Sequence, residues 1–91
     1  MKSDIREIII ASVKKLYTEE INDFDITRPK LKSHGNLSSN IALVLSKKLK
    51  VQPRKIAEDI VNEFPKKNWL NKIEIAGPGF INFFLTEQAQ T

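Results

Sequence analysis

Apolar residues recur with a helical period along three segments of the chain. The first segment starts at residue 3 or 4 and runs to about residue 20, with Asp4 and Glu7 at the spacing of a capping box. The second starts within residues 38–40 and runs through 48, and the third runs from Pro53, which suits a first helical position, to about 64. Each segment has one apolar stripe, so the pattern predicts three helices that pack against a shared core.

Two further segments alternate between apolar and polar positions, as strands do. In residues 24–31 the alternation is interrupted by Pro29, which removes one ladder donor and favours the edge of a sheet. Residues 72–85 alternate on either side of a Gly77-Pro78-Gly79 turn, which predicts a β-hairpin. The connector at 65–71 is expected to close one end of the core, and a helix start follows the hairpin.

The returning strand of the hairpin carries apolar residues on both of its faces. Because side chains alternate along a strand, the row of Phe80, Asn82 and Phe84 lies opposite the row that begins at Ile81. A chain of 91 residues builds a single core. We therefore expect the row that contains Phe80 and Asn82 to face solvent.

The predicted element order is α-β-α-α-β-β. It indicates an α+β fold in two layers, with three helices packed on a small antiparallel sheet of three to four strands. Residues 1–91 make a single domain, which is too small to enclose a deep catalytic cleft of its own.

Positive charge is concentrated in the middle of the chain. The net charge is +4, and no acidic residue occurs between Ile26 and Ala57. A basic stretch of this kind favours a polyanionic partner, because neutralised phosphates release counterions. The other explanation, that these lysines only keep the domain soluble, stays open. The candidates for phosphate contact are Arg28, Lys30, Lys32, Lys47, Lys50, Arg54 and Lys55.

The composition argues against several other classes of site. The chain has no cysteine and a single histidine, His34, so we expect no disulfide, no thiol nucleophile and no metal. Its apolar runs are too short for a membrane span, and its first residues do not resemble a secretory signal, which favours a cytoplasmic location. The adjacent carboxylates Glu58 and Asp59 diverge by about 100° on a helix, so they cannot work as an acid–base pair.

Three segments together resemble the N-terminal additional domain of arginyl-tRNA synthetases. They are Gly35–Leu43, Pro53–Glu58 and Ile73–Leu85, and the likeness spans nearly the whole chain. The block Ala-Gly-Pro-Gly-Phe-Ile-Asn, residues 76–82, is the most specific part. The resemblance implies an RNA-binding role at the elbow of tRNA, where the positions matched by Phe80 and Asn82 contact a base of the D-loop.

The resemblance also implies a longer parent protein. The parent would be an ATP-dependent arginine–tRNA ligase, with tRNA for arginine as its partner and with catalytic and anticodon-binding domains on the same polypeptide. ATP and arginine would bind in that parent and not in this segment. Neither the His-x-Gly-His signature nor the Lys-Met-Ser-Lys-Ser loop of the family occurs here, so the segment itself is expected to be non-catalytic and to bind no cofactor.

The sequence departs from the family pattern at two positions, and several alternatives stay open. Ala76 stands where some members have an amide, and Leu37 stands where many have an aromatic residue. Phe80 could be a core residue, and Asn40 could be a helix cap instead of a ligand. The domain could also be a structural appendage that docks on the synthetase body without contacting a base, or a free-standing RNA-binding protein.

Overall fold

The computed structural model describes the backbone of residues 1–90 and the side chains of residues 1–89. The elements are α1 (Lys2–Tyr17), β1 (Ile26–Thr27), the 3-10 turn η1 (Lys32–His34), β2 (Leu37–Ser39), α2 (Ile41–Leu49), α3 (Pro53–Glu63), β3 (Leu70–Ala76), β4 (Phe80–Leu85) and α4 (Glu87–Gln90). The strands form one four-stranded antiparallel sheet in the order β1-β2-β4-β3. The predicted α+β class is confirmed.

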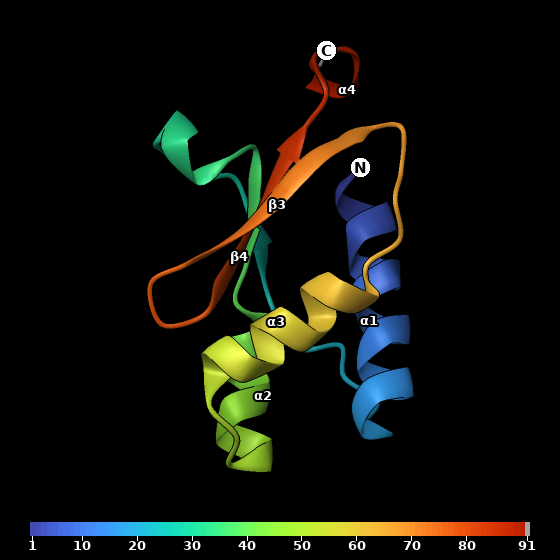
Figure 1. Ribbon diagram of the computed structural model, residues 1–91, viewed down its shortest axis with the longest axis vertical. Helices are drawn as coiled ribbons and strands as arrows, with labels where there is room; N and C mark the ends of the chain where they lie inside the picture. Colours follow the sequence, from blue (N-terminus) through green and yellow to red (C-terminus); the bar gives the residue numbers. More distant parts are fainter. Residues whose placement is uncertain (91) are drawn as a thin grey trace.

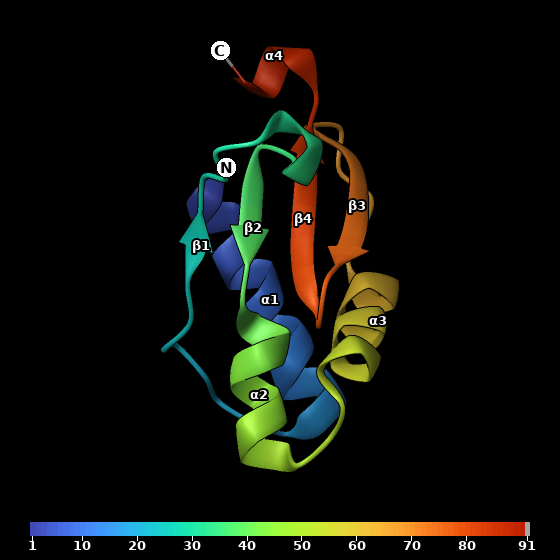
Figure 2. The same ribbon diagram turned by 90° about the vertical axis from the view of Figure 1, so that its left-hand side faces the viewer.

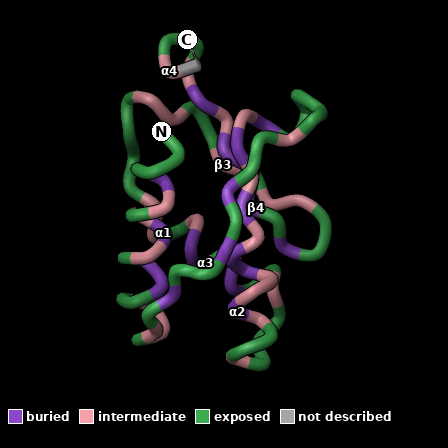
Figure 3. The backbone as a smooth tube through the Cα atoms, turned by 180° about the vertical axis from the view of Figure 1, so that it is seen from behind, coloured by how far each residue is buried: buried purple, intermediate pink, exposed green. Residues whose placement is uncertain are grey.

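The sheet has one covered face and one open face. In Figure 2 the strands face the viewer, α1 lies behind them, and only the η1 turn stands in front at one end. The buried positions gather where the helices and strands face each other (Figure 3). The largest fully buried side chains include Ile5, Ile9, Ile41, Leu45, Ile56, Ile60, Ile81 and Phe83. The helical stripes and the Ile81 row therefore make the core, as predicted.

The first helix differs from its prediction at both ends. It begins at Lys2 with Met1 in the N-cap position, so the capping box predicted for Asp4 and Glu7 is wrong. It ends at Tyr17, where Thr18 takes the left-handed conformation with φ 57° and its N–H donates to the Lys14 carbonyl. The helix ends at this residue because the chain that follows it returns to the core, where Ile21 and Phe24 are buried.

The sequence did not predict β2. Its three residues, Leu37–Ser39, are too few to show a strand period, and the serines beside a helix start look like caps. Ser39 does serve the helix, because its Oγ accepts the N–H of Ile41 at 3.2 Å. The strand β1 pairs only with β2 at the margin of the sheet, so the predicted edge position is confirmed, although β1 is only two residues long. The strand β3 begins at Leu70, inside the predicted connector.

The hairpin turn is docked on the start of α3. Gly77 and Gly79 both have positive φ, at 56° and 146°. Nη1 of Arg54 donates to the Gly77 carbonyl at 2.8 Å, and a Cβ on Gly79 would lie 2.9 Å from Cβ of Pro53. The Pro-Arg and Gly-Pro-Gly segments are thus two sides of one contact. None of the helices within residues 1–90 is long and apolar enough to span a bilayer.

Candidate nucleic-acid interface

The open face of the sheet carries the aromatic row of β4. In the register, Phe80 lies opposite Ala76, and Phe84 lies opposite Lys72. The Phe80 side chain is 40% exposed, so it is not a core residue. Phe84 is half-buried, with Nζ of Lys72 at 4.6 Å from the centre of its ring. Phe80 is therefore the open end of the row.

Asn82 does not face open water, so that prediction is wrong for this residue. It is only 3% exposed, and its Oδ1 accepts a hydrogen bond from Oγ of Ser38 at 2.7 Å. The physical reason is β2, because the register puts Ser38 directly across from Asn82 while Glu74 of β3 lies on its other side. Asn82 is a floor residue of the sheet face and not a projecting one.

A hollow of about 420 Å³ opens above this floor, and we call it the sheet-face hollow. Its floor contains Ser38 and Asn82, and Phe80 belongs to its wall. In Figure 1 the η1 segment and the β3–β4 turn project from the same side of the sheet, and residues from both segments line the hollow. The remaining lining residues are Thr27, Pro29 and His34 on one side and Ala76, Gly77 and Pro78 on the other.

The carboxamide of Asn82 presents one free donor to this hollow. Its Oδ1 is engaged by Ser38, whereas Nδ2 makes no hydrogen bond with the described residues. No fully buried side-chain nitrogen or oxygen in that part of the chain lacks a partner, so Nδ2 is not sealed in the interior, and Asn82 lines the hollow. The site can therefore offer an aromatic face from Phe80 and an N–H donor from Asn82, which suits a flat ring that carries a carbonyl oxygen.

The candidate cations lie in three parts of the fold, and those in the first two parts have no ion pair with the described residues. Arg28, Lys30 and Lys32 lie in the β1–β2 connection, and none of them has an ion pair with a described residue. Lys47 and Lys50, at the end of α2, are also exposed and without an ion pair to the described residues.

Arg54 and Lys55, at the start of α3, already have partners. Arg54 holds the hairpin turn, and Nζ of Lys55 lies 3.0 Å from Oδ1 of Asp59. Asp59 also accepts the hydroxyl of Tyr17 at 3.0 Å, which links α1 to α3. Burial first, and then the hydrogen bond and charge of Asp59, raise the pKa of Tyr17 to about 12. The hydrogen bond from Lys55 lowers the pKa of Asp59. Arg54 and Lys55 therefore each have a partner within the fold, and their contacts with phosphate stay predictions.

The loop before β2 is fixed to β4 by backbone contacts. The N–H of Asn36 donates to the Phe83 carbonyl at 2.9 Å, and Oδ1 of Asn36 accepts the N–H of Leu85 at 2.8 Å. Gly35 packs so closely that a Cβ there would lie 2.7 Å from the Phe83 carbonyl oxygen. These contacts place the β1–β2 loop, including His34, at the wall of the hollow, a role that no local sequence signal indicates for His34.

Asn40 does not cap the helix with its side chain, and its other suggested role, as a ligand, stays a prediction. It lies at the N-cap position of α2, but its side chain makes no cap hydrogen bond. Its Oδ1 accepts the N–H of Asp25 at 2.7 Å, and its Nδ2 donates to the Asp25 carboxylate at 3.3 Å. Asn40 therefore tethers the chain that leads into β1.

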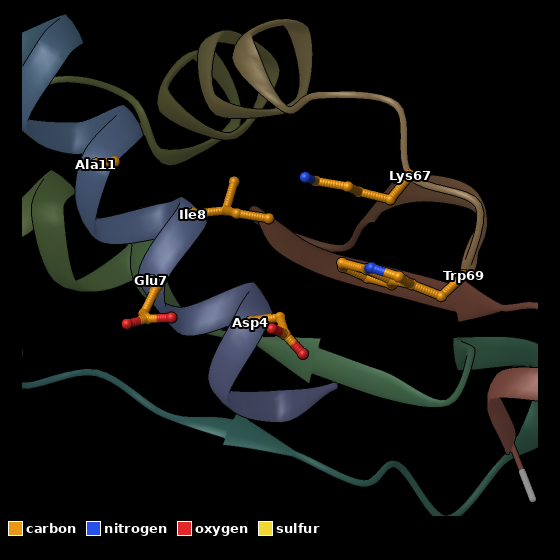
Figure 4. A pocket seen from close by; sticks show the side chains of 6 residues that line it. All are labelled: Asp4, Glu7, Ile8, Ala11, Lys67 and Trp69. Carbon is orange, nitrogen blue, oxygen red and sulfur yellow. The ribbon is translucent and has the colours of Figure 1, made fainter.

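A second depression, of about 320 Å³, lies between α1 and the α3–β3 connector (Figure 4). Trp69 and Lys67 extend from the connector towards α1, where Ile8 meets them. The partly buried Trp69 packs against the core, as predicted for this connector. Asp4 and Glu7 at the same depression make it a poor site for a polyanion. No group of three or more metal-ligating side chains occurs among residues that the structure describes.

Comparison with known proteins gives the family. Residues 3–85 match the family profile described as "Arginyl tRNA synthetase N terminal domain". An arginine–tRNA ligase of Caldanaerobacter subterraneus subsp. tengcongensis is 38% identical over 93 residues, which cover 94% of this chain and 16% of that protein. One from Shewanella loihica is 38% identical over 97 residues, covering 100% of this chain and 17% of that protein. The chain thus spans about a sixth of the length of these relatives.

Solved structures share the fold. The arginyl-tRNA synthetase of Thermus thermophilus superimposes with a TM-score of 0.83 at 19% identity, over 98% of this chain and 14% of that one. The enzyme of Plasmodium falciparum superimposes with a TM-score of 0.81 at 24% identity, over 96% of this chain and 16% of that one. Since the family profile covers almost the entire sequence, this chain belongs to the arginyl-tRNA synthetase N-terminal domain family.

Proposed function

We propose that the chain is the tRNA-binding module of a cytoplasmic, ATP-dependent arginine–tRNA ligase, and that it contacts a D-loop base at the tRNA elbow. The base enters the sheet-face hollow, while ATP and arginine bind in other domains of the parent protein. The support comes from family membership, from the open aromatic face of Phe80 and from the basic middle of the chain. The segment itself contributes binding and no chemistry.

The exposure of Phe80 carries this proposal. A side chain of this size that is 40% exposed beside a hollow gives up apolar burial, and stacking on a base offers a compensating contact. Such stacking contributes about 1 to 3 kcal/mol per base and is tolerant of sequence. A base in a tRNA loop can be unstacked and turned outward at a modest cost, whereas a base in a duplex cannot.

Asn82 adds selectivity for an acceptor group. Its free Nδ2 can donate to a carbonyl oxygen at a base edge, but its Oδ1 is engaged by Ser38. A uracil-like edge, with carbonyl oxygens, fits this donor better than an amino group does. Ala76, which lies beside Phe80 in the register, offers no side-chain hydrogen bond of its own.

Titration of labelled tRNA with the chain at several salt concentrations tests the proposal. Neutralisation of about 3 or 4 phosphates on a single strand gives a slope of about −2 to −3 in a plot of log affinity against log salt. Phe80→Leu keeps an apolar side chain but removes the aromatic face, and we expect about 5- to 100-fold weaker binding. Phe80→Tyr keeps the ring and serves as the matched control, with nearly unchanged binding. No binding by the unaltered chain at low salt, or equal affinities for all three proteins, would refute the proposal.

A structural role is the competing proposal, because exposed apolar residues also mark contacts between domains. In that case Phe80 docks on the synthetase body and the lysines have no specific partner. The full-length ligase separates the two proposals. If Phe80→Leu lowers the melting temperature of the ligase and leaves its tRNA affinity unchanged, docking is supported. If the variant weakens tRNA affinity and leaves the melting temperature unchanged, base contact is supported.

A further inference from the structure

Another hollow, larger than the sheet-face hollow, lies on the other side of the β1–β2 loop from it. It has a volume of about 680 Å³ and is bounded by the start of α1, the β1–β2 loop and the end of β4. The side chains of Lys2, Arg28 and Lys32 line it, and no acidic side chain does. We call it the basic hollow.

The cations of the basic hollow are not neutralised by the fold. Lys2, Arg28 and Lys32 have neither an ion pair nor a side-chain hydrogen bond with the described residues. Some cations elsewhere in the chain are paired, such as Lys48 with Glu19 at 2.8 Å and Lys55 with Asp59 at 3.0 Å. Like charges gathered in one concave place without counter-charges raise the local potential and favour an anion there.

The two hollows share a wall. Pro29 lines both of them, and other residues of the same loop line one hollow or the other. Thr27 and His34 belong to the sheet-face hollow, whereas Arg28 and Lys32 belong to the basic hollow. A single strand of RNA can therefore cross the loop at Pro29 and reach both hollows with neighbouring nucleotides.

We infer that the RNA strand follows this path: the base lies in the sheet-face hollow, and adjacent phosphates lie in the basic hollow on Lys2, Arg28 and Lys32. This inference rests on the proposed function and makes it more specific. It separates Arg28 and Lys32 of the β1–β2 connection from Lys47 and Lys50 at the end of α2, which line neither hollow. Phosphate contacts on one side of the base would also fix the orientation in which the strand enters.

Two charge-matched double variants test the path. Arg28→Gln/Lys32→Gln removes two charges at the basic hollow, and Lys47→Gln/Lys50→Gln removes two at the end of α2. All four side chains are exposed, so both variants are expected to keep the fold, which urea unfolding checks. The readout is the slope of log affinity for tRNA against log salt, where each phosphate contact on a single strand contributes about −0.7.

We expect the β1–β2 variant to reduce the magnitude of the slope by about 1.4 and to weaken binding several-fold at low salt, while the α2 variant stays close to the unaltered chain. Equal slopes for the two variants, or a larger change in the α2 variant, overturn the inferred path. If either of these slope results is found while the unaltered chain binds tRNA and Phe80→Leu weakens that binding, the path is overturned and the proposed function stands. If the unaltered chain does not bind tRNA, the proposed function and the path fall together.

Discussion

Replacement of Gly35 by alanine tests how the β1–β2 loop is held on the sheet. Gly35 has φ 84° and ψ −169°, a region that only glycine adopts without strain. A Cβ there would lie 2.7 Å from the carbonyl oxygen of Phe83 and 3.2 Å from its carbonyl carbon. That carbonyl cannot easily move, because it accepts the N–H of Asn36 at 2.9 Å.

These two effects add. The backbone strain costs about 1 to 3 kcal/mol, and the steric overlap with a fixed carbonyl costs about 1 to 3 kcal/mol more. We therefore expect Gly35→Ala to lower the free energy of unfolding by about 2 to 6 kcal/mol. Gly77→Ala is the matched control, because Gly77 also has a positive φ, 56°, but no atom lies within 4 Å of its added Cβ. Its expected cost is the strain alone, about 1 to 2 kcal/mol.

The assay is urea unfolding followed by the fluorescence of Trp69, the single tryptophan, which packs against the core. Comparable slopes against urea would show that the three proteins unfold from equally compact native states. If Gly35→Ala costs no more than Gly77→Ala, the close approach of the loop to β4 is wrong, and with it the shared wall of the two hollows.

Three further predictions concern the fold. Because the folded pKa of the only tyrosine, Tyr17, is raised to about 12, phenolate absorbance should appear near that pH in the native chain and near 10 in denaturant. The contribution of this pKa shift to the free energy of unfolding is complete below about pH 10 and is lost as the pH rises through about 12. Asp59→Asn should lower the native pKa of Tyr17 but not return it to the value in denaturant, since the burial of Tyr17 remains. Phe83→Ala, at a fully buried position, should cost about 3 to 5 kcal/mol in urea unfolding; a loss under 1 kcal/mol would contradict its place in the core. Asn40→Ala should cost about 1 kcal/mol by removing the tether to Asp25, and Asn40→Asp should not rescue it at neutral pH, because a second carboxylate would lie beside the first.

The sequence predicted most of the fold because the strongest local patterns coincide with the longest elements. The helical stripes around Ile9, Leu45 and Ile60, and the alternation in β4, each appear within one element and do not depend on a distant partner. Helix ends and very short strands depend on contacts across the chain. For this reason α1 ended early and β2 was not found.

The candidate site was predicted in part, and the error has one source. The strand alternation predicted the correct face for Phe80 and Asn82, but the exposure of Asn82 depends on what lies beside it in the sheet. That neighbour is Ser38 of β2, the strand that was missed. Without β2 the hollow could not be predicted either, because the wall with Pro29 and His34 comes from the loop that enters this strand.

The central claim is that a D-loop base stacks on Phe80 in the sheet-face hollow. A double-mutant cycle tests it most directly, with the chain unaltered or carrying Phe80→Leu and with tRNA that is intact or lacks one D-loop base at a time. At one position in the D-loop, we expect the two changes together to weaken binding by less than the sum of their separate effects, because both remove the same contact. The expected coupling energy is about 1 to 3 kcal/mol. Additive effects at every position of the D-loop would contradict the claim.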